Sequence, residues 1–202
     1  MQSAVPEAID FQQETEATKT LYGLDQDHTK LAGQRLLAAR RMVERGVRFV
    51  QVFPSKYGVW DSHRQLKQNH ERLCGTLDLP VAGLIRDLKQ RGLLEETLVV
   101  FCTEFGRTPG LERRGGGKDG RDHHPNGFTI WMAGAGLKRG YVHGATDELG
   151  YHVVQDRCTI YDVWATVLHQ LGMDHQRLTY RHAGRDFRLT DVHGNVIQPI
   201  LL

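Results

Sequence analysis

The sequence predicts an α/β fold with a mainly parallel sheet and flanking helices. Segments rich in β-branched and aromatic residues alternate along the chain with segments whose apolar residues recur at helical spacing. The apolar run over residues 97–103 is continuous rather than alternating, which is typical of a strand covered on both faces. The 202 residues are enough for one core, so we expect a single domain over residues 1–202.

The first half of the chain contains two expected helices and one expected strand. Residues 1–27 are polar and form a lead-in without a usable motif. Apolar residues at helical spacing predict a helix over residues 29–45, and the β-branched and aromatic residues 47–53 predict a strand. A second helix is expected over residues 81–91, with Pro80 at its start.

The second half begins with the strand over residues 97–103 and continues with a third strand over residues 128–133. A third helix is expected to start at Thr159, because Asp162 three residues later completes a capping box. Residues 185–197 are expected to form a terminal hairpin that turns at Gly194 and Asn195.

Composition narrows the possible partners. The net charge of +2 is too small to indicate nucleic acid or an anionic membrane. No run of about eighteen apolar residues predicts a membrane span, and the polar N-terminus shows no export signal, so the compartment stays unknown. Three widely spaced cysteines fit neither a disulfide framework nor a zinc knuckle, and Cys102 is expected to be a buried thiol.

Asp61 and His63 follow the strand expected over residues 47–53. A carboxylate and an imidazole two residues apart can both reach one divalent ion. The alternative is a surface turn in which Asp61 caps the following helix.

Glu104 and Arg107 directly follow the strand over residues 97–103, so the sheet would hold them at its rim. Glu104 could bind a metal while Arg107 grips an anionic oxygen, a task that suits a planar guanidinium. The alternative is a structural ion pair between the two side chains.

Asp122, His123 and His124 form the densest group of potential ligands. Adjacent histidines do not usually bind the same ion, so one is expected to be a ligand and the other to face the substrate or support the site. Together, these groups predict a metal-assisted hydrolase site for phosphate or sulfate esters. A pair of histidines in a loop can also be plain polar surface.

The motifs appear in a recognisable order: Trp60-Asp61-Ser62-His63, then TLVVFCTEFGRTP over residues 97–109, then GRDHHP over residues 120–125. This series resembles a sulfatase-like bacterial family, domain of unknown function 1501, in the alkaline phosphatase superfamily. The resemblance covers the chain from about Arg45 to the C-terminus. It implies the sulfatase-like sheet fold, with the N-terminal part missing so that this chain is a C-terminal portion.

Superfamily members bind two divalent metals, commonly zinc or manganese, and attack the ester with a Ser, Thr or modified Cys. By position, the resemblance implies metal ligands at Asp61, His63, Glu104 and His123, with Glu104 standing in for an Asp. Phe105 replaces a ligand His, so one ligand is lost. The nucleophile would lie upstream of the matched residues.

The resemblance therefore predicts a metal-dependent hydrolase whose substrate is a small anionic ester stabilised by Arg107 and His124. One alternative is a non-catalytic binding or scaffold protein that keeps the fold, and another is a metal-dependent mutase. Relatives often carry an export signal. Because a sheet without its first strands has an open edge, we also expect self-association of this chain.

Overall fold

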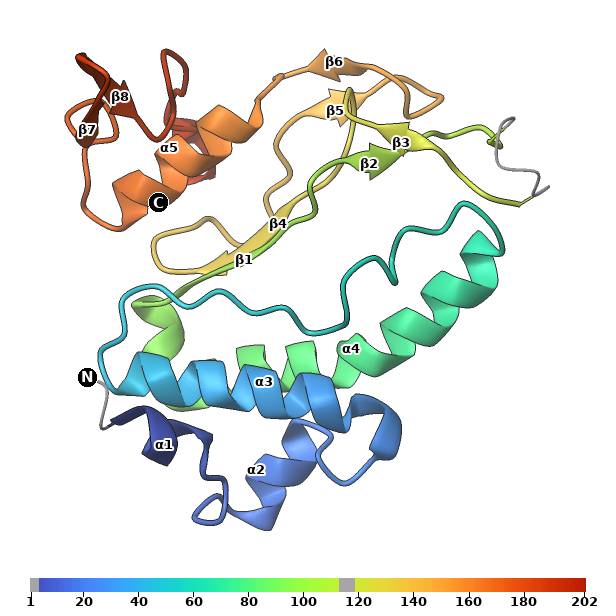
Figure 1. The fold of residues 1–202 in the computed structure, drawn as a ribbon, viewed down its shortest axis with the longest axis vertical. Coiled ribbons are helices and arrows are strands. Elements are labelled where there is room, and N and C mark those ends of the chain that lie inside the picture. The colour runs from blue at the N-terminus through green and yellow to red at the C-terminus, as the bar shows by residue number, and fades with distance from the viewer. Residues whose placement is uncertain (1–3, 113–118) are drawn as a thin grey trace. The chain divides into compact units, whose positions relative to one another are not determined.

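A computed structural model describes residues 4–112 and 119–202. The chain forms two compact units (Figure 1). Unit 1 comprises Met1–Leu94 and Gly110–Asp122, and unit 2 comprises Glu95–Pro109 and His123–Leu202. The chain therefore passes from unit 1 to unit 2, returns, and passes to unit 2 again, so Asp122 and His123 are neighbours in sequence that belong to different units.

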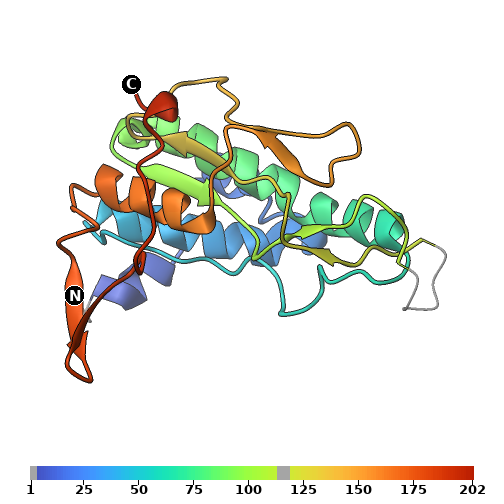
Figure 2. The same cartoon turned by 90° about the horizontal axis from the view of Figure 1, so that it is seen from above.

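Unit 1 is helical. Its helices are α1 Ala4–Ile9, α2 Glu16–Leu21, α3 Asp27–Glu44 and α4 Leu66–Gln90, and the 3-10 turn η1 Leu93–Glu95 follows α4 in the chain. The long helices α3 and α4 pack side by side, as Figures 1 and 2 both show. Their facing apolar stripes supply most of the buried side chains of this unit: Ala32, Leu36, Leu37, Ala39, Leu73, Leu77, Leu84 and Leu88. Burial of these stripes stabilises both helices.

The expected helix over residues 29–45 is confirmed by α3. The expected start of the second helix at Pro80 is wrong, because α4 begins at Leu66 and runs through Pro80. Leu73 and Leu77 before the proline and Leu84 after it are all buried, so the apolar stripe continues across it. A proline inside a helix costs about 3 kcal/mol, which this packing offsets.

A buried ionic cluster joins the helices of unit 1. Arg40 is 2% exposed, and its guanidinium lies 2.9 Å from Asp87, 2.9 Å from Glu14 and 2.5 Å from Glu44. Burial alone would lower the pKa of Arg40, but the carboxylates of Glu44, Glu14 and Asp87 raise it above its ordinary value. The charge on Arg40 is therefore fixed.

The strand expected over residues 47–53 is not formed. Among the described residues of unit 1 this segment has no strand partner, although its side chains have high β propensity. Propensity alone does not make a strand, because the ladder needs a second backbone.

Unit 2 contains four two-stranded antiparallel sheets. The ladders join β1 Leu98–Phe101 to β4 Trp131–Gly134, β2 Gly106–Arg107 to β3 His123–His124, β5 Ala145–Thr146 to β6 Val153–Gln155, and β7 Thr179–His182 to β8 Arg185–Arg188. The predicted mainly parallel, alkaline-phosphatase-like sheet is therefore wrong: the described residues contain five α-helices and only these short antiparallel pairs.

The ladder between β1 and β4 shows why the fold class was mispredicted. The apolar run suggested a strand covered on both faces, but β1 has a single neighbour, in antiparallel register from Leu98↔Gly134 to Phe101↔Trp131. The rings of Phe101 and Trp131 stack 5.4 Å apart and are both exposed. Cys102 is exposed as well, so the buried thiol expected there is also wrong.

The C-terminal part of unit 2 contains α5 Ile160–Gln170 and the 3-10 turn η2 Gln198–Ile200. The capping box at Thr159 and Asp162 is confirmed. The hairpin expected over residues 185–197 is wrong, because β7 and β8 turn earlier, at Ala183 and Gly184. Both turn residues have positive φ, 47° and 82°, which matches the twist of a two-residue hairpin.

Replacing Asp162 by alanine is expected to destabilise unit 2 by about 1 kcal/mol near neutral pH. Its carboxylate accepts hydrogen bonds from the Thr159 backbone N–H, at 2.6 Å, and from the Asn195 backbone N–H, at 2.7 Å. Burial alone would raise the pKa of Asp162, but these bonds lower it below its ordinary 3.8.

Because the folded-state pKa is lowered, this stabilisation is present above the unfolded pKa and is lost as pH falls through the folded value. Thermal unfolding between about pH 6 and about pH 3 should show the difference between the parent and Asp162→Ala shrinking. Glu148→Ala, which removes an exposed carboxylate of the same unit, is the control. A difference that stays constant with pH would contradict the role of the ionised cap.

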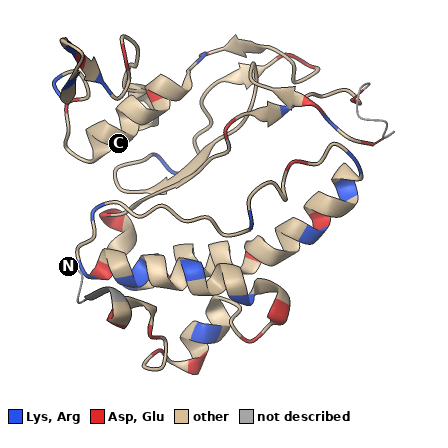
Figure 3. Ribbon diagram, viewed as in Figure 1, with Lys and Arg blue, Asp and Glu red and all other residues tan. Residues whose placement is uncertain are grey.

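None of the described helices is long and apolar enough to cross a membrane. Lys and Arg residues are interspersed with Asp and Glu residues along α3 and α4 (Figure 3), in line with the small net charge of +2.

Candidate metal centre

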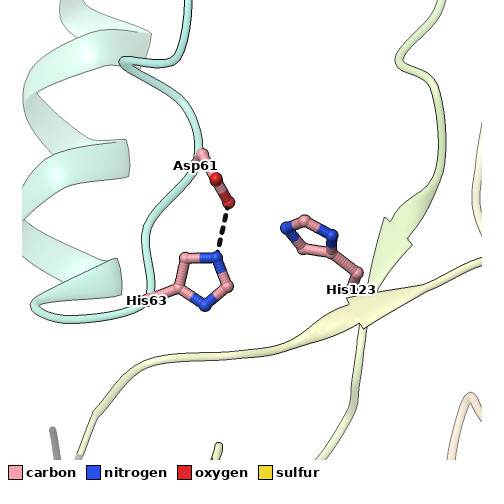
Figure 4. A group of neighbouring side chains, drawn as sticks. All are labelled: Asp61, His63 and His123. Atoms are coloured by element: carbon pink, nitrogen blue, oxygen red, sulfur yellow. Dashed lines mark ion pairs between the residues drawn. The ribbon is translucent and has the colours of Figure 1, made fainter. Parts of the chain in front are cut away.

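The centre of the candidate site is the imidazole of His63, in the loop before α4. Its Nδ1 lies 2.6 Å from Oε2 of Glu112, and its Nε2 lies 2.9 Å from Oδ1 of Asp61 (Figure 4). Asp61 is exposed, whereas the Glu112 side chain is only 8% exposed. The structure therefore brings together Asp61 and His63, as the sequence suggested, and adds a carboxylate from far along the chain.

Glu112 is the residue that sequence reasoning missed. It lies 49 residues beyond His63, in a glycine-rich segment that carries no ligand spacing. The Glu112 backbone N–H donates to the carbonyl oxygen of Gly120, 3.0 Å away, which holds this acidic side chain in place. The only signal for Glu112 in the sequence is that it is an acidic residue a short distance before the group Asp122, His123 and His124.

Asp122 completes a group of three potential ligands. One ligand atom each from His63, Glu112 and Asp122 lies within 4.8 Å of the other two, and all three residues are partly buried. All three belong to unit 1, so the packing of that unit alone defines their arrangement. One nitrogen and two carboxylate oxygens form a donor set that zinc and manganese both accept.

The segment that carries Glu112 and Asp122 is held against the loop of His63 by backbone contacts. The Gln65 backbone N–H donates to Oδ1 of Asp119, 2.9 Å away. A methyl group at Gly120 would come within 1.8 Å of the His63 carbonyl oxygen, so only glycine permits this approach. The ligand geometry therefore depends on close backbone packing as well as on the side chains.

The other predicted site residues lie in unit 2. Glu104 is exposed after β1, Arg107 is half-buried in β2, and His123 and His124 form β3. Figure 4 also draws His123, on this strand. The ladder pairs Arg107 with His123 and Gly106 with His124.

The two adjacent histidines have different surroundings. His123 is exposed, and its ring lies 4.5 Å from that of Phe105. His124 is 2% exposed, and its Nε2 lies 2.6 Å from the Tyr151 carbonyl oxygen. A carbonyl only accepts, so the Nε2–H of His124 donates, and this ring is fixed by the backbone of unit 2.

Residues 1–201 match a family described as Protein of unknown function (DUF1501). The chain belongs to this family. No curated protein and no solved structure matches this chain.

In this DUF1501 member the surroundings of His63 suit a metal ligand. A ligating histidine presents one bare ring nitrogen to the ion and donates its other N–H to an oxygen, usually of a carboxylate or a carbonyl. If Nδ1 faces the ion beside Glu112 and Asp122, then Asp61 is placed to accept the Nε2–H at 2.9 Å. Asp61 would then orient the ligand instead of being one.

Proposed function

We propose that the chain is a metal-dependent hydrolase of phosphate or sulfate esters, with one divalent ion, zinc or manganese, held by His63, Glu112 and Asp122. The observation that carries the proposal is the convergence of these three ligand atoms within 4.8 Å. Asp61 supports it, because a carboxylate on the second ring nitrogen is the usual companion of a ligand histidine.

A bound ion would supply Lewis-acid activation of the ester. The residues of the chain do the rest: Asp61 fixes the ring of His63, and the two carboxylates balance the charge of a divalent ion. Arg64 directly follows His63 and Arg121 directly precedes Asp122, so a guanidinium-bearing residue flanks two of the ligands in the chain. Positively charged residues beside the ligands in the sequence support an anionic substrate in this proposal.

The proposed function also includes a relation of this chain to the alkaline phosphatase superfamily. That relation is supported by the motifs at residues 60–63, 97–109 and 120–125, and not by the fold. The resemblance also implies roles for residues of unit 2, Glu104 and His123 as ligands and Arg107 and His124 as groups that stabilise the substrate's charge; the ligand set proposed here does not depend on them. Each is tested below by its own substitution.

The second candidate is a binding or scaffold protein without catalysis. Phe105 favours it, because the resemblance implies a ligand histidine at this position, whereas the phenyl ring here packs 4.5 Å from the ring of His123. A site that has lost a ligand can keep a metal and lose the reaction.

Metal binding is tested by elemental analysis of the purified chain and by calorimetric titration with zinc and manganese. We expect about one ion per chain and at least a tenfold loss of affinity in His63→Ala and Glu112→Gln. Matched controls in the same unit are His28→Ala and Glu71→Gln, which change exposed residues of α3 and α4. Asp61→Asn should weaken metal binding by no more than about tenfold, because the amide oxygen still accepts the Nε2–H although the negative charge is lost.

Hydrolysis of aryl phosphates and sulfates by the metal-loaded chain then separates the two candidates. Metal-dependent turnover that falls in Arg107→Ala and His124→Ala supports the hydrolase, whereas binding without turnover supports the scaffold. If Glu104→Ala and His123→Ala leave the metal affinity unchanged, the ligands belong to unit 1 alone. A chain that takes up no ion overturns the proposed site.

A further inference from the structure

Residues 47–53 form an extended segment, and its backbone has no backbone partner from Arg48 onward in the described part of the chain. Among residues 4–112 and 119–202, no backbone hydrogen bond joins residues 48–54 to another part of the backbone. Two contacts tie the ends of the segment to α3: the Val47 backbone N–H donates to the carbonyl oxygen of Met42 at 3.1 Å, and the guanidinium of Arg35 donates to the carbonyl oxygen of Phe53 at 2.6 Å. This segment therefore has the unsatisfied donors and acceptors of an open sheet edge.

The side chains of this segment are those of a strand. Valines at positions 47, 50 and 52 are half-buried, whereas Phe49 is 61% exposed and Phe53 is 70% exposed. On the inner side, a groove of about 390 Å³ separates the segment from α3, lined by Arg35, Ala38 and Met42 of the helix. The segment is therefore not closely packed against α3, and it exposes two large aromatic rings to water.

We propose that residues 47–53 pair with the same residues of a second copy of the chain, as an antiparallel ladder centred on Val50. In this register Val47 lies opposite the partner's Phe53, and Phe49 lies opposite the partner's Gln51. Aromatic and β-branched residues are favourable cross-strand partners. Arg48 lies opposite the partner's Val52, so no like charges face each other. Both copies use the same residues in the ladder, so the dimer has two-fold symmetry.

Pairing of two copies fits both the unpaired backbone and the low charge of residues 47–53. In a ladder centred on Val50, the residues Arg48, Val50 and Val52 exchange backbone hydrogen bonds with the second copy, which an apolar ligand in the groove would not do. The segment carries a single charged residue, Arg48, so little electrostatic repulsion opposes the approach of two copies. The inference is independent of the metal site and of the proposed hydrolase.

Analytical ultracentrifugation over a concentration series tests the proposal on the full chain. We expect a dimer, and about a tenfold rise in its dissociation constant in Phe49→Lys and in Phe53→Lys. Both residues are exposed, so circular dichroism should show unchanged folding. Val154→Lys, at a 66% exposed apolar residue of β6, is the control and should leave the dimer intact.

The register is tested by crosslinking after Cys74, Cys102 and Cys158 are replaced by serine. Residues that meet on the two-fold axis of an antiparallel ladder have Cα atoms about 4.5 to 5.5 Å apart, within reach of a disulfide. Val50→Cys should therefore form a covalent dimer on oxidation, and Val154→Cys should not. A monomer at every concentration, a dimer that resists both lysine variants, or equal crosslinking at positions 50 and 154 would overturn the proposal.

Discussion

Replacing Asp87 by alanine is expected to destabilise unit 1 by about 3 to 5 kcal/mol, a large part of the roughly 5 to 15 kcal/mol that stabilises a typical domain. Asp87 lies in α4, is 4% exposed, and is contacted by three polar side chains. Arg40 Nε lies 2.9 Å and Arg91 Nε 2.7 Å from its oxygens, and the hydroxyl of Tyr22 donates to it at 3.0 Å.

The expected loss of stability is large because Arg40 and Tyr22 would stay buried without the Asp87 carboxylate. Arg40 would remain buried and charged, since its raised pKa prevents it from losing the proton. Tyr22 is completely buried, and burial together with the Asp87 carboxylate raises the pKa of Tyr22 above its ordinary 10.0, so its hydroxyl stays protonated and would lose its acceptor. A buried cation would therefore lose one of its carboxylate partners, and a buried hydroxyl would lose its acceptor.

Chemical denaturation followed by far-ultraviolet circular dichroism measures the effect, because α3 and α4 hold most of the helical residues. Asp78→Ala, at an exposed position of the same helix, is the matched control and should cost less than about 0.5 kcal/mol. Equal stability of Asp87→Ala and Asp78→Ala would contradict the account.

Local sequence patterns predicted the parts of the fold that depend on residues within a single helix. The stripe of α3 and the capping box of α5 depend on residues a few positions apart, and both were found where expected. The strand at residues 47–53 and the parallel sheet failed because a ladder depends on a second backbone, about which local composition says nothing.

The candidate site divides in the same way. Asp61 and His63 are two residues apart, so their spacing was visible in the sequence. Glu112 was not, because its approach to His63 spans 49 residues and depends on the path of the segment that returns to unit 1. Gly120 was equally hidden, since its role is to leave space and not to supply a group.

Replacing Gly120 by alanine is expected to lower the metal affinity of the chain on the order of 100-fold while leaving the helices of unit 1 folded. The added methyl group would lie 1.8 Å from the His63 carbonyl oxygen and 2.2 Å from the carbonyl carbon. Both atoms are backbone, so no side-chain rotation can relieve the clash, and the two segments must move apart.

That movement would separate the ligands. Glu112 is tied to Gly120 through its backbone N–H, so displacing Gly120 also displaces the carboxylate that lies 2.6 Å from Nδ1 of His63. The helices α3 and α4 pack through other residues, so their circular dichroism should be unchanged. Metal affinity is far more sensitive than folding to shifts of this size, because ligand distances are tolerated only within about 0.2 Å.

Zinc titration measures the affinity, and hydrogen exchange at the Glu112 amide reports the segment's position without any metal. Gly110→Ala is the matched control, since a methyl group at that position, at the other end of the same segment, meets no atom within 4 Å. We expect fast exchange and weak binding in Gly120→Ala alone. Weak binding with slow exchange at Glu112 would mean that the segment had stayed in place, and unchanged binding would mean that it does not carry the ligands.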